Sequence, residues 1–142
     1  MSIEEKKAIC RRIVDEVNKR NLDTAIELIA SDYVDHSDPP GTSPGPLAVK
    51  QRFTMLCSAF PDLRVALEDM VAEGDRVAVR FTLHGTHYGD FMGMSPTGKH
   101  VTVSGIDINR IRDGKLVERW ASVDMLGMLQ QLGAIPEPAQ TP

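Results

Sequence analysis

The sequence predicts a single α+β domain in which a cone-shaped, curved antiparallel sheet wraps around N-terminal helices and encloses a pocket. Two observations lead to this prediction. Apolar residues recur at helical spacing in the first part of the chain, and from Leu63 onward they alternate with polar residues as strands require. The 142 residues contain no linker and no internal repeat. We therefore expect one domain over residues 1–135 and a disordered tail over residues 136–142.

The part before Leu63 is predicted to contain three helices. Ser2 opens a capping box ahead of the first apolar stripe, and Asn21 caps a second, shorter helix that runs through Ile29. Residues 31–44 are polar, contain several prolines, and are predicted to form a long loop. Pro46 suits the first turn of the third helix.

The second half is predicted to be a run of strands followed by one short helix. Alternation of apolar and polar residues places strands over residues 64–68, 77–84, 101–112 and 115–123. Asp113-Gly114 joins the last two strands and is a strong hairpin signal. Leu126–Leu132 forms the last helix, and Gly133 caps it.

The register of this hairpin predicts which side chains share a face. A two-residue turn gives the cross-strand pairs Asn109 with Glu118, Asp107 with Trp120, and Val103 with Asp124. Asp107, Trp120 and Asp124 would then share one face, opposite an apolar face that includes Ile106 and Ile108; a single bulge would shift this register. Two arrangements stay open: the acidic face is in water, or it lines a pocket under the helices and a second subunit covers the apolar face.

Composition and motifs exclude several classes of function. The formal net charge is −4 and basic residues are scattered, so nucleic acid is not an expected partner. No apolar run is long enough to cross a membrane, and the N-terminus resembles no signal or transit peptide, so we expect a cytoplasmic protein. Cys10 and Cys57 are interpreted as core residues. Phosphate loops, metal-ligand spacings and nucleophile motifs are absent, so we expect no cofactor and no metal.

Carboxylates and imidazoles therefore remain as the groups that could carry chemistry. A carboxyl group desolvated beside an aromatic wall acquires a raised pKa, which suits proton transfer near neutral pH. On this ground we predict that Asp107 is the acid–base group, ahead of Asp124, which could instead cap the last helix. His36 and His87 are expected to reach the site from loops and polarise a substrate carbonyl.

The run from Gly85 to Lys99, GTHYGDFMGMSPTGK, resembles the pattern GTHxGxFxGxxPTG of the SnoaL-like polyketide cyclase (ester cyclase) family. The order of the later residues also fits this family over nearly the whole second half. In the first half, Tyr33 to His36 and Phe60-Pro61-Asp62 are similar to the family as well.

The resemblance implies a fold like that of the nuclear-transport-factor superfamily, usually dimeric, and ring closure of polyketide esters by an acid–base pair without metal or nucleotide. It places His36, His87, Trp120 and Asp124 around the pocket. We expect four further residues to contact a small apolar substrate: Phe53, Tyr33, Phe91 and Met94.

One departure from the family concerns the acid–base pair. When the Asp-Gly-Lys hairpins are aligned, the founding cyclases carry a histidine where this chain has Asp107, and their aspartate lies near Ala121. The leading hypothesis is enolate, aldol-type chemistry by a lyase or isomerase, with Asp107 or Asp124 replacing that pair. The alternatives are hydrolysis or hydration as in epoxide hydrolases of related fold, and a binding protein without turnover.

Overall fold

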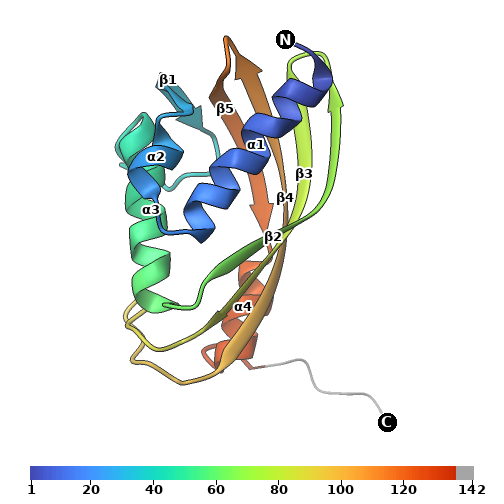
Figure 1. Cartoon of the computed structure of the whole chain (residues 1–142). Helices are drawn as coiled ribbons and strands as arrows, with labels where there is room; N and C mark the ends of the chain where they lie inside the picture. The colour runs from blue at the N-terminus through green and yellow to red at the C-terminus, as the bar shows by residue number, and fades with distance from the viewer. Residues whose placement is uncertain (137–142) are drawn as a thin grey trace.

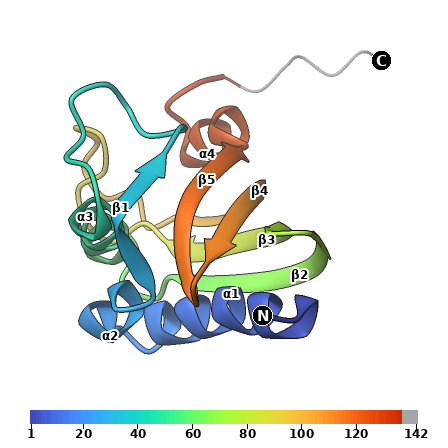
Figure 2. The same cartoon turned by 90° about the horizontal axis from the view of Figure 1, so that it is seen from above.

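The computed structural model describes residues 1–136, in which helices cover one face of a curved, unclosed sheet (Figures 1 and 2). The helices of this part of the chain are α1 (Ile3–Asn18), α2 (Leu22–Ile26), α3 (Pro46–Ala59) and α4 (Met125–Leu132). The strands are β1 (Ile29–Asp35), β2 (Arg64–Glu73), β3 (Arg76–Thr86), β4 (His100–Arg112) and β5 (Lys115–Val123). The predicted α+β class is confirmed. None of the helices in residues 1–136 has the length and apolar character needed to cross a membrane.

The sheet has the order β1-β5-β4-β3-β2 and is antiparallel except at one edge. There β1 pairs with β5 in parallel, with Asp35 opposite Arg119. The sequence prediction was wrong here, because it ended the second helix at Ile29 and treated Ser31–Pro44 as loop. β1 forms because its main chain bonds to β5, which lies more than 80 residues further along the chain. This addition brings Tyr33 and Asp35 onto the sheet.

Local sequence signals define the start of α1, the start of α3 and the end of α4 as predicted. Asn21 precedes α2, but its side chain makes no capping hydrogen bond. In α1 the Ser2 side chain accepts a hydrogen bond from the Glu5 N–H, and the Glu5 carboxylate accepts one from Ser2 N–H. Pro46 occupies the first turn of α3. Gly133 ends α4 with a φ of 81°, a left-handed conformation that glycine adopts without a Cβ clash.

The β4–β5 hairpin contains a bulge that corrects the predicted register. Arg112 pairs with Lys115 as predicted, but the register shifts between Arg110 and Ile111, and Val117 is the extra residue. From there Arg110 pairs with Glu118, Asn109 with Arg119, Ile108 with Trp120, and Asp107 with Ala121. The predicted pairing of Asp107 with Trp120 is therefore wrong. Asp107 faces the helices, and Trp120 lies on the opposite, outer face together with Ile106 and Ile108.

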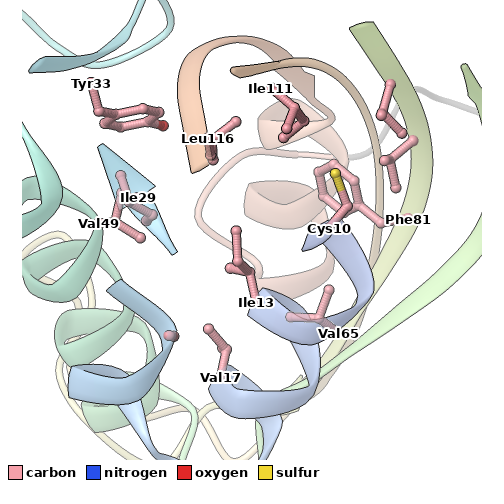
Figure 3. Packing of buried hydrophobic residues seen from close by; sticks show 13 residues of the cluster. Cys10, Ile13, Val17, Ile29, Tyr33, Val49, Val65, Phe81, Ile111 and Leu116 are labelled. Carbon is pink, nitrogen blue, oxygen red and sulfur yellow. The ribbon is translucent and has the colours of Figure 1, made fainter. Parts of the chain in front are cut away.

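Two apolar clusters fill the space between the helices and the inner face of the sheet. The α1 cluster includes Cys10, Ile13 and Val17 of α1, Tyr33 of β1 and Phe81 of β3, and Figure 3 shows these side chains in the interior. The α4 cluster lies at the other end of the sheet, beside α4 (Figure 1). It consists of Ala59, Phe60, Leu63, Phe91, Val101, Val103, Met128 and Leu132.

Beyond the end of β5, an edge of β4 is covered by a side chain instead of a strand. The Thr102 N–H donates to Gln131 Oε1 at 2.8 Å, and Gln131 Nε2 donates to the Thr102 carbonyl at 2.9 Å. Within β4, Gly105 lies under the ring of Phe81, since a Cβ at this position would come within 2.4 Å of the ring. Only glycine allows the Phe81 ring to cross the strand so closely.

Candidate active site

A chain of charged side chains lies on the inner face of the sheet, and Asp107 forms its inner end. Asp107 is 9% exposed. Its Oδ2 accepts a hydrogen bond from Arg119 Nε at 2.9 Å, and its Oδ1 accepts one from Asn109 Nδ2 at 2.7 Å. Both neighbours are donors, so both oxygens of the carboxyl group are held as acceptors in a fixed orientation.

The chain continues from Arg119 to Asp35, the central group of the network. The Asp35 side chain is fully buried and accepts hydrogen bonds from five donor groups on four residues. These donors are Tyr33 Oη, the Ser37 N–H and hydroxyl, Arg52 Nη1 and Arg119 Nη1. Arg52 Nη1 also contacts Asp38 at 3.2 Å. Carboxylates and guanidinium groups thus alternate from Asp38 to Asp107.

The network sets the ionisation of its central groups. Burial opposes the charge of Asp35, but the hydrogen bonds from Ser37 and the charge and hydrogen bond of Arg119 outweigh it and hold its pKa well below the usual range. Burial likewise disfavours the charge of Arg119, yet the carboxylates of Asp107 and Asp35 raise its pKa above the usual value. Asp35 and Arg119 therefore remain an ion pair across the working pH range.

Two neutral groups from the α1 cluster border this charged chain. Burial raises the pKa of Tyr33 above its usual range, so the phenol stays protonated and donates to Asp35 at 3.0 Å. Burial raises the pKa of Cys10 to about 12, and the negative charge of Asp107 adds to this. Cys10 is therefore a neutral thiol on the α1 side of Asp107, which is consistent with the core role predicted for it.

His36 and Trp120 lie on the outer face, away from Asp107. Their rings stack with centroids 5.0 Å apart, and His36 Nε2 lies 2.6 Å from Glu118 Oε2. Glu118 also accepts from Arg110 Nε at 2.8 Å, and the Arg76 guanidinium lies 5.1 Å from the centre of the indole. The aromatic wall predicted beside Asp107 is therefore absent, because the bulge turns Trp120 to the other side of β5.

His87, Phe91 and Met94 lie at the α4 end of the interior. Phe91 is buried in the α4 cluster, and Met94 packs against that cluster. The Thr97 N–H donates to His87 Nδ1 at 3.2 Å, so the proton of the neutral ring is on Nε2. That nitrogen is fully buried and has no hydrogen-bond partner in residues 1–136. His87 thus anchors the loop before β4, whereas Asp107 borders the α1 cluster.

Asp124 and Phe53 complete the set of predicted site residues. Asp124 is exposed and caps α4 by accepting a hydrogen bond from the Gly127 N–H at 2.9 Å, the structural alternative named for it. It lines a groove of about 590 Å³ whose walls include Ile106 and Leu126, on the outer side of the sheet. Phe53 lies on α3, half-buried and in contact with both apolar clusters.

Two of the nine predicted site residues, Tyr33 and Asp107, lie in the charged network. The other members of the network were not predicted as site residues from the sequence. Arg119 was missed because the assumed register put Trp120 in its place. Asp35 and Arg52 were missed because β1 was taken for a loop. The adjacent apolar residues Leu116 and Val117, which interrupt the strand alternation, were the available sign of the bulge. Within residues 1–136, no cluster of three or more His, Cys, Asp or Glu side chains could hold a metal ion.

Comparison with known proteins identifies the family. Residues 8–132 match the SnoaL-like polyketide cyclase family. Aklanonic acid methyl ester cyclase DauD from Streptomyces sp. (strain C5) is 33% identical over 94% of this chain and 83% of its own length. AclR from Streptomyces galilaeus, for which a hydroxylase activity has been suggested, has a similar structure with a TM-score of 0.87 and 34% identity, covering 98% of this chain and 87% of AclR.

IdmH from Streptomyces antibioticus, a suggested polyketide cyclase, is also 34% identical, with a TM-score of 0.80 over 90% of this chain and 98% of IdmH. The family match covers most of the chain, and these likenesses extend over nearly all of it. The chain therefore belongs to the SnoaL-like polyketide cyclase family.

Proposed function

We propose that this protein is a cyclase that closes a ring in a small apolar carbonyl substrate by aldol-type chemistry, using its own side chains and no cofactor, with Asp107 as the proton carrier. The observation that carries the proposal is the setting of Asp107. Its carboxylate is nearly buried on the inner face, and Arg119 and Asn109 fix both of its oxygens. Membership of the family and the likeness to a methyl ester cyclase support the reaction class.

In this mechanism Asp107 removes a proton from the carbon next to a substrate carbonyl. The C–H bond breaks and an O–H bond forms on Asp107. The electron pair of the C–H bond forms the carbon–carbon double bond of the enolate, and the π pair of the carbonyl group moves onto its oxygen. The enolate carbon then attacks a second carbonyl group of the same molecule, and Asp107 returns the proton to the new alkoxide oxygen. A positioned group that both takes and returns a proton contributes roughly 10²–10⁴ in rate.

The departure from the founding cyclases bears on which group carries the proton. By the family resemblance, their acid–base pair corresponds to Asp107 and to the vicinity of Ala121. In the structure Asp107 and Ala121 are cross-strand partners, so these positions adjoin on the inner face of the sheet. The methyl group of Ala121 cannot exchange a proton. Asp107 therefore carries the proton without an aspartate partner at that position.

The test is a pair of matched substitutions, each of which removes one carboxylate. Asp107→Asn should lower turnover at least about 100-fold while ligand binding is kept. Asp124→Asn should leave turnover close to wild type, since asparagine also caps helices and Asp124 lies on the outer groove. Both variants are assayed by proton exchange of a ketone or ester in deuterium oxide, monitored by nuclear magnetic resonance.

Each other outcome selects a different assignment. Turnover that depends on Asp124 and survives Asp107→Asn would move the acid–base role to Asp124. If both variants remain fully active, neither carboxylate is the acid–base group, and a different residue carries the proton. Tight binding without turnover in the wild-type protein would instead identify a small-ligand-binding protein.

A second candidate function is hydration, in which Asp107 takes the proton from a water molecule that opens an epoxide or ester. One observation favours it as the runner-up: Ala121 stands where, by the family resemblance, the cyclases carry their aspartate. Turnover in oxygen-labelled water separates the two functions, because hydration incorporates the label into the product and aldol closure does not.

A further inference from the structure

Two of the three guanidinium nitrogens of Arg119 donate hydrogen bonds to carboxylates. Nε donates to Asp107 and Nη1 donates to Asp35, each at 2.9 Å. Nη2 has no hydrogen-bond partner among residues 1–136. Among the side-chain nitrogen and oxygen atoms of residues 1–136, His87 Nε2 alone is fully buried without a hydrogen-bond partner. Because Arg119 Nη2 also has no partner, it cannot be fully buried. Nη2 must therefore belong to the 15% of the Arg119 side chain that is exposed.

The two carboxylates also fix the direction in which Nη2 points. A guanidinium group is planar, so bonds at Nε and Nη1 determine the position of Nη2. Asp35 is itself immobilised by further donors from Tyr33, Ser37 and Arg52. The structure thus presents a permanently charged donor whose position needs no reorganisation when a ligand arrives, which is the arrangement that stabilises developing negative charge most effectively.

We infer that Arg119, through its free Nη2, receives the negative charge that develops on the substrate oxygen when Asp107 removes a proton. This inference rests on the proposed function, and it assigns the electrophilic partner of the base. It also defines the ligand class: an apolar compound whose carbonyl, enol or phenol oxygen reaches Nη2 and becomes an oxyanion there. The same guanidinium then contacts both the proton acceptor and the oxygen of the reacting group.

The charges of the network fit this role. Asp38, Asp35 and Asp107 face Arg52 and Arg119, so the ionised site carries one net negative charge. Proton transfer neutralises Asp107 and places one negative charge on the substrate oxygen. The C–H electron pair moves into the enolate double bond, and the carbonyl π pair moves onto oxygen. The net charge of the site is unchanged, and Arg119 exchanges one anionic partner for another.

The experiment uses para-nitrophenol as a probe, because its phenolate absorbs visible light and its oxygen mimics an enolate oxygen. Its methyl ether, para-nitroanisole, is the matched neutral ligand. Bound nitrophenol should titrate about one pH unit below free nitrophenol, the effect of one charged hydrogen bond in a partly exposed site. The phenolate should therefore bind about tenfold more tightly than the phenol, whereas binding of para-nitroanisole should not change with pH.

Four variants identify the group responsible. Arg119→Gln should abolish the shift, and Arg119→Lys should keep part of it. Arg110→Gln should leave it unchanged, because Arg110 makes a similar pair with Glu118 on the outer face. Asp107→Asn should enlarge it, since Arg119 then loses one of its two anionic partners. If Arg119→Gln does not fold, the wild-type, Asp107→Asn and Arg110→Gln titrations still decide the question.

The inference is overturned if wild-type protein binds nitrophenol without a downward shift, does not bind it at all, or keeps the shift in Arg119→Gln. It is also overturned if Asp107→Asn leaves the shift unchanged. These titrations involve no turnover, so they are independent of the test of Asp107 as the base. Normal turnover in Asp107→Asn would refute the proposed function, and an absent phenolate shift would refute the role of Arg119.

Discussion

The two faces of the β4–β5 hairpin carry the same kind of ion pair in different surroundings. On the inner face Arg119 binds Asp107 at 2.9 Å, and on the outer face Arg110 binds Glu118 at 2.8 Å. The inner pair continues into the fully buried Asp35. The outer pair adds only His36, whose side chain is 44% exposed. Distance therefore does not distinguish the two pairs.

The difference lies in how many fixed donors and how much water surround each carboxylate. The side chains of Arg110 and Glu118 are 27% and 22% exposed, against 15% and 11% for Arg119 and Asp107. Water therefore reaches the outer pair more readily and can replace a lost partner there, which lowers the contribution of that pair to stability. The inner carboxylates have protein donors in place of water, so removal of one of them takes from a largely buried guanidinium an anionic partner that water cannot replace. The inner network should thus be rigid and costly to disturb, which is the property that a catalytic constellation requires.

The largest effect expected from this comparison is on stability. Asp35→Asn should lower the free energy of unfolding by about 3–5 kcal/mol, because it leaves Arg52 and Arg119 without their shared charge. The matched substitution on the outer face is Glu118→Gln, which should leave the urea midpoint close to that of wild type. Equal losses in the two variants, measured by urea unfolding, would show that the two faces do not differ in this way.

Acid should also weaken the inner network, because protonation of Asp35 removes the same negative charge as the Asp35→Asn substitution. The pKa of Asp35 is lowered from its usual value of 3.8, so its contribution to stability is fully present above that pH and is lost as the pH falls through the lowered value. The unfolding midpoint of the wild-type protein should therefore drop progressively below pH 3.8. The Asp35→Asn variant should show a flatter profile there. Parallel profiles for the two proteins would contradict the assignment.

A smaller effect tests the packing of the inner face next to the network. Gly105→Ala should destabilise the protein by about 1–3 kcal/mol, because its Cβ would press on the Phe81 ring. Ser104→Ala, one residue away on the exposed face, should have little effect. Phe81→Leu combined with Gly105→Ala should recover part of the loss that Gly105→Ala causes. Thermal unfolding of the single and double variants checks the whole set.

The smallest effect concerns the outer face as a contact surface. We expect a homodimer, since Ile106 and Ile108 are 55% and 38% exposed on this face of the sheet. Ile106→Asp should weaken the association about tenfold, or ~1.4 kcal/mol. Leu47→Asp, which removes an equally exposed apolar side chain from α3, should not. Sedimentation of the wild-type protein as a clean monomer at micromolar concentration would contradict the dimer.

Signals that lie within a few residues of each other predicted most of the fold. The capping box at Ser2, the Asp113-Gly114 turn and Gly133 each act on adjacent backbone, so they hold in any tertiary setting. One of the two open arrangements placed Asp107, Trp120 and Asp124 together under the helices. Asp107 is buried there, but Trp120 and Asp124 lie on the outer face, so this arrangement is wrong for two of its three residues.

What could not be predicted depends on contacts between distant segments. β1 exists because β5 lies beside it, and no local pattern announces that pairing. The bulge at Val117 reversed every side chain of β5 beyond it relative to the predicted register, exchanging Trp120 for Arg119 on the inner face. Because of this one extra residue, the predicted register did not place Arg119 in the site. For this reason alternation within one strand is a weak guide to cross-strand partners beyond the first few residues after a turn.

The bond between Gln131 and Thr102 has a consequence for how molecules of this chain meet one another. Where β5 ends, β4 would present an unpaired N–H and carbonyl, the template on which a foreign strand extends a sheet. The Gln131 amide supplies one donor and one acceptor at the spacing that a neighbouring strand would use. The Gln131 side chain on α4 thus takes both main-chain groups of Thr102, and a foreign strand finds no unpaired N–H or carbonyl at this residue.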